Sequence, residues 1–328
     1  MTLTPTSHRT SGLLIAVAAA AAFATSGPFV KPLLDSGWSP AAAVAVRAGA
    51  GGLVLLVPAL IALRGRYHLL LRSWKLIVGY AVIAVVGSQV FYFASIQYLP
   101  VGVALLIEYT APILLVLLAW ARSRVAPALL TVAGAVLSVA GLALVINPSG
   151  GGGLHPLGIL FAVLAALCLA GYYLIAALPT GELPPVTLVS VGLIAGAVAL
   201  AGVGATGLVP LAVTDDAVEI AGLGEVPWFV PMAIVVIVAT AFAYFASLIG
   251  AGRLGSRLAS FVGLLEVLFA VLFAWLLLGE VPTLVQALGG ALIVAGVVCV
   301  RMQRDAVSVE PALPDPLPDP TATRVGRE

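Results

Sequence analysis

Charged side chains are scarce in this chain of 328 residues: Asp, Glu, Lys and Arg make up 9% of it, whereas 62% of the residues are hydrophobic. A single soluble core of this size cannot bury so much apolar side chain, so the composition excludes a soluble globular protein and indicates that lipid is the solvent. The net charge is only +1. With no basic cluster in a polar domain, nucleic acid is not expected as a partner.

Residues that bind metals or carry redox chemistry are also rare. The two cysteines, Cys168 and Cys299, fall inside hydrophobic segments, and the three histidines fall in a tail or in loops. Neither a disulfide framework nor a metal centre is predicted, and no cofactor is expected. The chain also lacks a His-Glu-x-x-His motif, a nucleophile elbow and a phosphate-binding Gly-rich loop. The sequence therefore does not favour an enzyme or an ATP-driven pump.

Hydrophobic segments fill the chain between these few charges. A helix needs about 20 apolar residues to cross ~30 Å of hydrocarbon, and segments of that length predict an all-α, polytopic membrane bundle of about ten transmembrane helices. The expected helices cover residues 12–34, 40–63, 76–99, 101–121, 126–147, 156–178, 185–208, 228–250, 257–279 and 283–301.

The basic residues predict the orientation of this bundle, because Lys and Arg are retained on the cytoplasmic side of short loops. With the N-terminus inside, only Lys31 and Arg47 fall within helices, and every other Lys or Arg falls in a cytoplasmic loop or tail. The expected outer loops carry acidic residues instead. The prediction is a multi-pass protein of the cell membrane with both termini in the cytoplasm.

The two halves of the chain repeat one another. Most matches have an offset of 155 residues, and one upstream motif has an offset of 152. The matching pairs are VLLAW at 116–120 and VLFAW at 271–275, Gly134 and Gly289, VAG at 139–141 and 294–296, and YFAS at 92–95 and 244–247. Five helices per repeat would place the second repeat upside down in the membrane. Inverted repeats are typical of secondary transporters.

The repeats define the expected domains. A cytoplasmic tail (1–11) precedes the first five-helix repeat (12–147), and an extracytoplasmic linker (148–155) leads to the second repeat (156–302). Residues 303–328 are Pro-rich and acidic, so we expect a disordered cytoplasmic tail.

These features resemble the EamA family of the drug/metabolite transporter superfamily over about residues 12–302. The likeness rests on the paired hydrophobic-Ala-Trp helices, the Leu-Leu-Gly-Glu ending at 277–280 and the layout of five plus five helices. More narrowly, FY at 91–92, SIQ at 95–97, PVG at 100–102 and EYTAP at 108–112 are similar to bacterial threonine and homoserine exporters. The resemblance implies export of amino acids or similar metabolites. The chain departs from the family at Val267, where a proline is common, and at residues 122–125, which replace a Gly-Glu ending.

Four charged residues inside the membrane are candidate site residues, because each would cost at least ~2.5 kcal/mol near the bilayer centre without a partner or water. Glu266 is expected near the middle of the ninth helix. Glu108 lies about 10 Å below the outer end of the fourth helix, Arg47 lies at a similar depth in the second, and Lys31 lies near the outer end of the first. A pair of Glu108 with Arg47 or Lys31 would lower the cost and recognise a zwitterion. The alternatives are structural ion pairs, a snorkelling Lys31 beside Asp35, and proton carriage by the two carboxyl groups.

Other polar and aromatic residues are candidates for the lining of a transport path, with packing as the alternative. They are Gln97, Tyr109, Thr110, Tyr92, Tyr244 and Tyr172. Pro112 removes a backbone hydrogen bond within the fourth helix, which predicts either a kink beside Glu108 or plain bending. Close helix approach is expected at five glycines, Gly49, Gly51, Gly52, Gly289 and Gly290.

The sequence thus predicts a secondary transporter that exports small metabolites by alternating access, with amino acids such as threonine or homoserine as cargo and protons as a candidate coupling ion. The alternatives are uptake of sugars or nucleotide-sugars and, in a different class, a membrane-embedded scaffold or enzyme. The expected partners are a small-molecule substrate and membrane lipid. The oligomeric state is left open.

Overall fold

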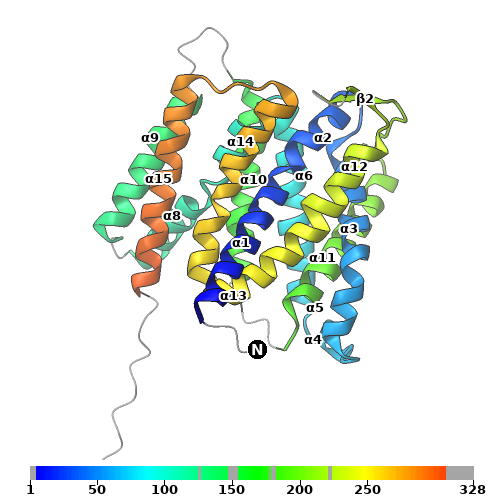
Figure 1. Cartoon of the computed structure of the whole chain (residues 1–328), viewed down its shortest axis with the longest axis horizontal. Helices are drawn as coiled ribbons and strands as arrows, with labels where there is room; N and C mark the ends of the chain where they lie inside the picture. Colours follow the sequence, from blue (N-terminus) through cyan, green and yellow to red (C-terminus); the bar gives the residue numbers. More distant parts are fainter. Residues whose placement is uncertain are drawn as a thin grey trace, which may run out of the picture.

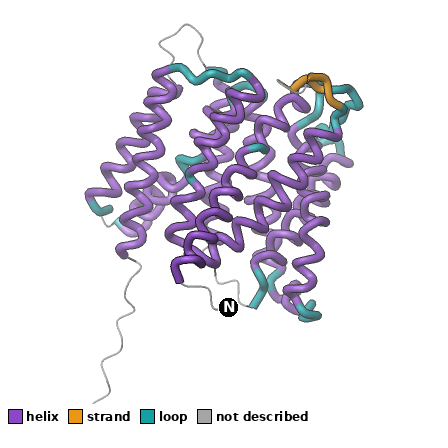
Figure 2. Tube along the Cα trace, in the orientation of Figure 1, coloured by secondary structure: helices purple, strands orange, loops and turns teal. Residues whose placement is uncertain are grey.

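The chain is a bundle of membrane-spanning helices in a computed structural model that describes residues 5–124, 127–146, 154–176, 178, 182–220 and 224–307 (Figures 1 and 2). Among these residues, seven helical stretches are long and apolar enough to cross a membrane. Shorter apolar helices cover Leu129–Val145, Leu265–Leu278 and Leu284–Val300. The polytopic all-helical fold predicted from composition is therefore confirmed.

The first repeat contains five membrane crossings. The first is α1 (Pro5–Ala24) and α2 (Ser26–Asp35), and the second is α3 (Pro40–Leu63), which Ser39 caps by accepting a hydrogen bond from the Ala42 N–H at 3.2 Å. A short α4 (His68–Arg72) leads to the third crossing. The third crossing consists of α5 (Trp74–Gly79), the π-helix η1 (Tyr80–Gly87) and α6 (Ser88–Ile96). The fourth consists of α7 (Val101–Glu108) and α8 (Ala111–Ser123), and the fifth is α9 (Leu129–Ile146).

The second repeat begins with α10 (Pro156–Ala176) and α11 (Pro185–Ala205). The sequence did not predict the antiparallel hairpin that follows, β1 (Val218–Ile220) and β2 (Gly224–Val226), in which Glu219 pairs with Glu225. The remaining elements are α12 (Phe229–Val236), the π-helix η2 (Ile237–Phe242), α13 (Ala243–Gly263), α14 (Leu265–Leu278) and α15 (Leu284–Val307). The hairpin marks one end of the bundle, the hairpin end, and α4 marks the other, the α4 end (Figure 1).

The prediction of a loop at residues 251–256, between the eighth and ninth helices, is wrong. The structure instead assigns these residues to helix α13, which continues through Arg253 to Gly263. Arg253 Nη1 donates a hydrogen bond to the Ser11 hydroxyl of α1 at 3.1 Å.

The C-terminal region extends beyond the helix predicted for it. Helix α15 continues to Val307, whereas residue 301 was the expected end. The Pro-rich segment from residue 308 onward and residues 148–153 of the expected linker lie outside the described part of the chain.

Glycine contacts between α9 and α15 show that the two repeats are inverted. The helices lie side by side at one edge of the bundle (Figure 1), where Gly134 faces Gly296 and Gly141 faces Gly289. A Cβ atom on any of the four would come within 3.0 Å of the facing glycine's carbonyl oxygen. Gly134 is equivalent to Gly289, and Gly141 to Gly296, so a two-fold rotation exchanges the two contacts. The equivalent helices therefore run antiparallel.

Both repeats break the same helix at the same place. The fourth crossing is interrupted at Tyr109 and Thr110, between α7 and α8, and the ninth at Leu264, between α13 and α14. Tyr109 and Leu264 are 155 positions apart, which is the offset of the repeat. The sequence predicted continuous helices here. Pro112 explains the first break, since a proline ring clashes with the carbonyl four residues earlier, and that residue is Glu108, where α7 ends.

Candidate functional site

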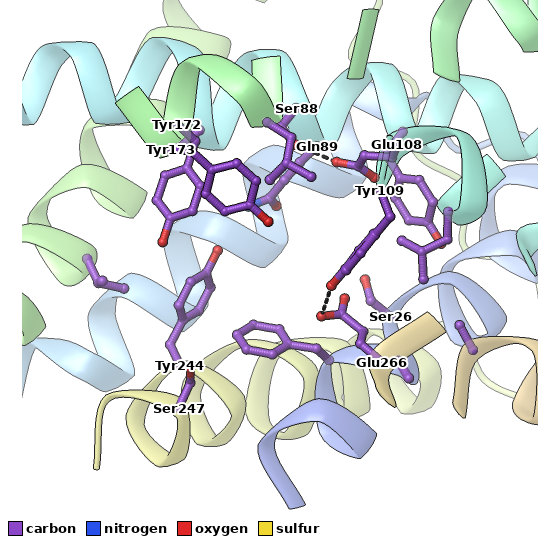
Figure 3. A pocket seen from close by; sticks show the side chains of 18 of the residues that line it. Ser26, Ser88, Gln89, Glu108, Tyr109, Tyr172, Tyr173, Tyr244, Ser247 and Glu266 are labelled. Carbon is purple, nitrogen blue, oxygen red and sulfur yellow. Dashed lines mark hydrogen bonds between the residues drawn. The ribbon is translucent and has the colours of Figure 1, made fainter. Parts of the chain in front are cut away.

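The interrupted helices surround a central cavity of about 320 Å³ between the two repeats (Figure 3). Cavities of this size hold small molecules. Both π-helical crossings contribute to its wall, as do α2, α7, α10 and α14. The polar residues that line it are Ser26, Arg47, Tyr80, Ser88, Gln89, Tyr92, Glu108, Tyr109, Tyr172, Tyr173, Tyr244, Ser247 and Glu266.

Glu108 enters the cavity from the first repeat. It is the last residue of α7, and the side chain is buried. Its Oε1 accepts a hydrogen bond from the Ser88 hydroxyl of α6 at 2.7 Å (Figure 3). The break after α7 thus ends the helix with a carboxyl group at the cavity wall.

Glu266 enters the same cavity from the second repeat. The sequence placed it in the middle of the ninth helix, but it lies in the first turn of α14, just after the break at Leu264. Its Oε2 accepts a hydrogen bond from the Tyr109 hydroxyl at 2.7 Å (Figure 3). Because Tyr109 lies at the break of the fourth crossing, this bond joins the two breaks across the repeat interface.

Arg47 supplies a buried positive charge beside these carboxyl groups. Its Nε donates to the Thr240 hydroxyl at 2.8 Å, its Nη1 donates to the Ser26 hydroxyl at 2.7 Å, and its Cζ lies 5.6 Å from the centre of the Phe93 ring. The predicted pair with Glu108 is wrong, because no carboxylate of the described residues lies within ion-pair distance of Arg47. Thr240 belongs to the π-helix η2, and Ser26 is the first residue of α2 after the break at Thr25, so hydroxyl groups beside two irregularities of the helices accept from the guanidinium instead.

Lys31 lies outside the cavity, at the hairpin end. It pairs with Glu280 after α14, rather than with Glu108 or Asp35, and its Nζ also donates to the Leu99 carbonyl at 3.4 Å. Glu280 Oε2 accepts a hydrogen bond from the Val101 N–H at 2.8 Å. This Lys31–Glu280 cross-link ties α2, α7 and α14 together at one end of the bundle.

The remaining predicted residues divide into two groups. Tyr92, Tyr109, Tyr172 and Tyr244 line the cavity. Gln97 is exposed, and Thr110 is buried with its hydroxyl donating to the Ile107 carbonyl at 2.7 Å, so neither lines the cavity. Pro112 lies in the first turn of α8, where its missing N–H costs no hydrogen bond, and it breaks the helix rather than kinking it.

Sequence reasoning missed five polar residues of the lining: Ser26, Tyr80, Ser88, Gln89 and Ser247. Gln89 lies three residues before Tyr92, which places the two side chains on one face of a helix. It is also a polar residue in an otherwise apolar stretch, and these two signals would have identified it. Gln89 is 8% exposed, and its Oε1 has no hydrogen-bond partner among the described residues.

The family model agrees with this architecture. EamA, the EamA-like transporter family, matches residues 10–147 and 156–302. The chain belongs to the EamA-like transporter family. It is therefore a multi-pass membrane protein and a transporter of small metabolites, and the match does not single out the threonine and homoserine branch.

Comparison with solved structures supports the fold. One of them, titled "Crystal structure of protein", aligns with 91% of this chain and 99% of its own length at 21% identity and a TM-score of 0.60. At that identity the likeness shows the fold alone. No curated protein matches the chain.

Proposed function

We propose that this EamA-family chain is a secondary exporter of small zwitterionic metabolites, with amino acids as the main class. The observation that carries the proposal is the charge pattern of the central cavity. A guanidinium without a carboxylate partner lines it together with two carboxyl groups, at Arg47, Glu108 and Glu266. The guanidinium offers a positive field to a substrate carboxylate, and a carboxylate accepts hydrogen bonds from an ammonium group.

The inverted repeats supply the transport mechanism. Alternating access needs one site that either repeat can expose to one side of the membrane. The cavity reaches toward the α4 end, since Tyr172 lies near the end of α10 and Val189 near the start of α11. At the hairpin end, the Lys31–Glu280 cross-link holds the bundle together. We interpret this arrangement as the state that loads substrate from the α4 end, which the basic loops predict to be cytoplasmic.

Proton coupling is proposed for the two carboxyl groups. An ionisable group within a membrane protein that faces a cavity is a common proton carrier. Glu108 and Glu266 lie next to the two helix breaks, one in each repeat. A rearrangement of the repeats would therefore change the surroundings of both carboxyl groups. Exchange of a proton for a substrate ammonium at either carboxylate would couple the two movements without any further cofactor.

Transport by purified protein in vesicles tests this function. Vesicles preloaded with a labelled panel of amino acids, sugars and nucleotide-sugars are diluted into buffers with and without a pH gradient. We expect gradient-sensitive loss of particular amino acids, and loss of the gradient effect in Glu108→Gln and Glu266→Gln. Movement of sugars instead of amino acids would contradict the zwitterion assignment, and gradient sensitivity in both variants would contradict proton coupling.

A further inference from the structure

We propose that Gln89 recognises the amino group of the transported molecule: its amide oxygen accepts a hydrogen bond from the substrate ammonium, beside the Glu108 carboxylate. This inference rests on the function proposed above and assigns a specificity role to a residue outside the charged set.

The first argument is the unsatisfied amide. Gln89 Oε1 is buried in the cavity wall and has no hydrogen-bond partner among the described residues. A buried acceptor left without a donor costs about 1–3 kcal/mol, and such groups in native proteins are few. Gln89 lines the cavity, so rotation of its terminal amide would bring this oxygen to the cavity surface. A donor on an entering molecule would then remove the cost, which favours molecules that carry an N–H or O–H group.

The second argument is the use of the neighbouring polar groups. The Ser88 hydroxyl is committed to Glu108 Oε1, the Tyr109 hydroxyl to Glu266 Oε2, and the Arg47 Nε and Nη1 groups to hydroxyls. These bonds hold the charged side chains in place within the wall. The amide oxygen of Gln89, in contrast, receives no hydrogen bond from the described part of the wall.

The third argument is the position of Gln89 relative to a carboxylate. Ser88, whose hydroxyl holds Glu108, is the preceding residue of α6, and both Gln89 and Glu108 line the cavity (Figure 3). An ammonium group has three donors. The Glu108 carboxylate would balance the positive charge of the ammonium group. The neutral Gln89 amide would accept a second hydrogen bond, which requires an N–H group and not only a charge.

The test separates charge from hydrogen bonding by comparing L-homoserine with its N-trimethyl derivative, which keeps the positive charge and has no N–H. Binding is measured as ligand-induced thermal stabilisation of the purified full-length protein, alongside vesicle transport. We expect wild type to prefer L-homoserine, and we expect Gln89→Met, of similar shape but without the amide, to reduce that preference about 10- to 100-fold. Gln89→Glu keeps an acceptor and is expected to retain the preference. Gln97→Met, at an exposed position, is the matched control.

A second measurement distinguishes a substrate role from a structural one. Without ligand, Gln89→Met removes an unsatisfied buried polar atom, so its melting temperature is expected to equal or exceed that of wild type. Equal preference in Gln89→Met and wild type would overturn the inference and leave the transporter proposal intact. A failure of L-homoserine and the other amino acids of the panel to stabilise wild type would also overturn it. Amine binding that depends on Gln89, without transport of any panel member, would support the Gln89 assignment and contradict the transporter proposal.

Discussion

At the residue scale, Glu108 and Glu266 face one cavity from opposite repeats, and each accepts a hydrogen bond from a hydroxyl group, Ser88 for Glu108 and Tyr109 for Glu266. Sequence reasoning identified both carboxyl groups and Arg47 because charge is so rare in this chain. It assigned the wrong partners, since position along a helix gives depth in the membrane but not the direction of a side chain. Arg47 instead donates hydrogen bonds to Thr240 in the π-helix η2 and to Ser26 at the start of α2. No hydrophobic pattern reveals the π-helix or the break at Thr25 that precedes Ser26.

The Tyr109 hydroxyl is expected to hold Glu266 in its working position. Tyr109→Phe removes the 2.7 Å hydrogen bond while leaving the ring in place. A hydrogen bond to a charged group contributes about 1.5–3 kcal/mol. We therefore expect transport to fall by about tenfold or more, and the melting temperature to fall by a few degrees. The matched control is Tyr98→Phe, whose ring is 43% exposed and stacks on His155 outside the cavity. Equal transport by the two variants would contradict this role for Tyr109.

At the scale of helices, the sequence predicted the positions of most crossings but not their interruptions. Pro112 indicated an irregularity at the first break, and the sequence analysis interpreted it as either a kink or plain bending. The break at Leu264 has no proline, and Gly263, a poor helix former, is the local feature beside it. The π-helices η1 and η2 gave no signal either, because a π-segment is set by packing and hydrogen bonding rather than by hydrophobic period. In contrast, the close helix approach predicted from glycines is found at Gly51, Gly52, Gly289 and Gly290, whereas a Cβ at Gly49 would make only an ordinary contact with Ala197.

The α9–α15 crossing is expected to depend on its glycines. In Gly296→Ala, the added Cβ would collide with the Gly134 carbonyl and the Ser138 hydroxyl, and overpacking of this kind costs about 1–3 kcal/mol. Gly202→Ala in α11 is the control, since a Cβ there meets nothing within 4 Å. Alanine is the better helix former by about 1 kcal/mol. The two variants should therefore shift the melting temperature in detergent in opposite directions, and equal shifts would contradict the close crossing.

At the scale of the whole molecule, the inverted repeats and the Lys31–Glu280 cross-link together suggest a bundle closed at the hairpin end. The two ion pairs of the described residues differ in exposure. The side chains of Lys31 and Glu280 are 20% and 17% exposed, whereas those of Arg66 and Glu182, near the α4 end, are 42% and 69% exposed. Exposed pairs contribute little, so the pair at the hairpin end is the one expected to influence the conformational equilibrium.

Breaking that pair is expected to open the hairpin end. Lys31→Met leaves Glu280 partly buried without its cation, which favours conformations that expose it to water. A cysteine placed in the wall by Leu105→Cys, in a background with Cys168→Ser and Cys299→Ser, reports access through labelling by a membrane-impermeant thiol reagent. We expect faster labelling from the hairpin side in Lys31→Met and no change in Arg66→Met. Unchanged labelling in Lys31→Met would contradict the closure assigned to this pair.

The central claim is that substrate passes through the cavity between the two repeats. Ala270 is 1% exposed and lines that cavity, whereas Leu276 on the same helix is 58% exposed. The direct measurement is counterflow, in which vesicles preloaded with unlabelled amino acid accumulate the labelled form, for Ala270→Trp and Leu276→Trp. Filling the cavity with an indole is expected to abolish counterflow, and the same indole at the exposed position is expected to preserve it. Counterflow that persists in a folded Ala270→Trp protein would contradict the account.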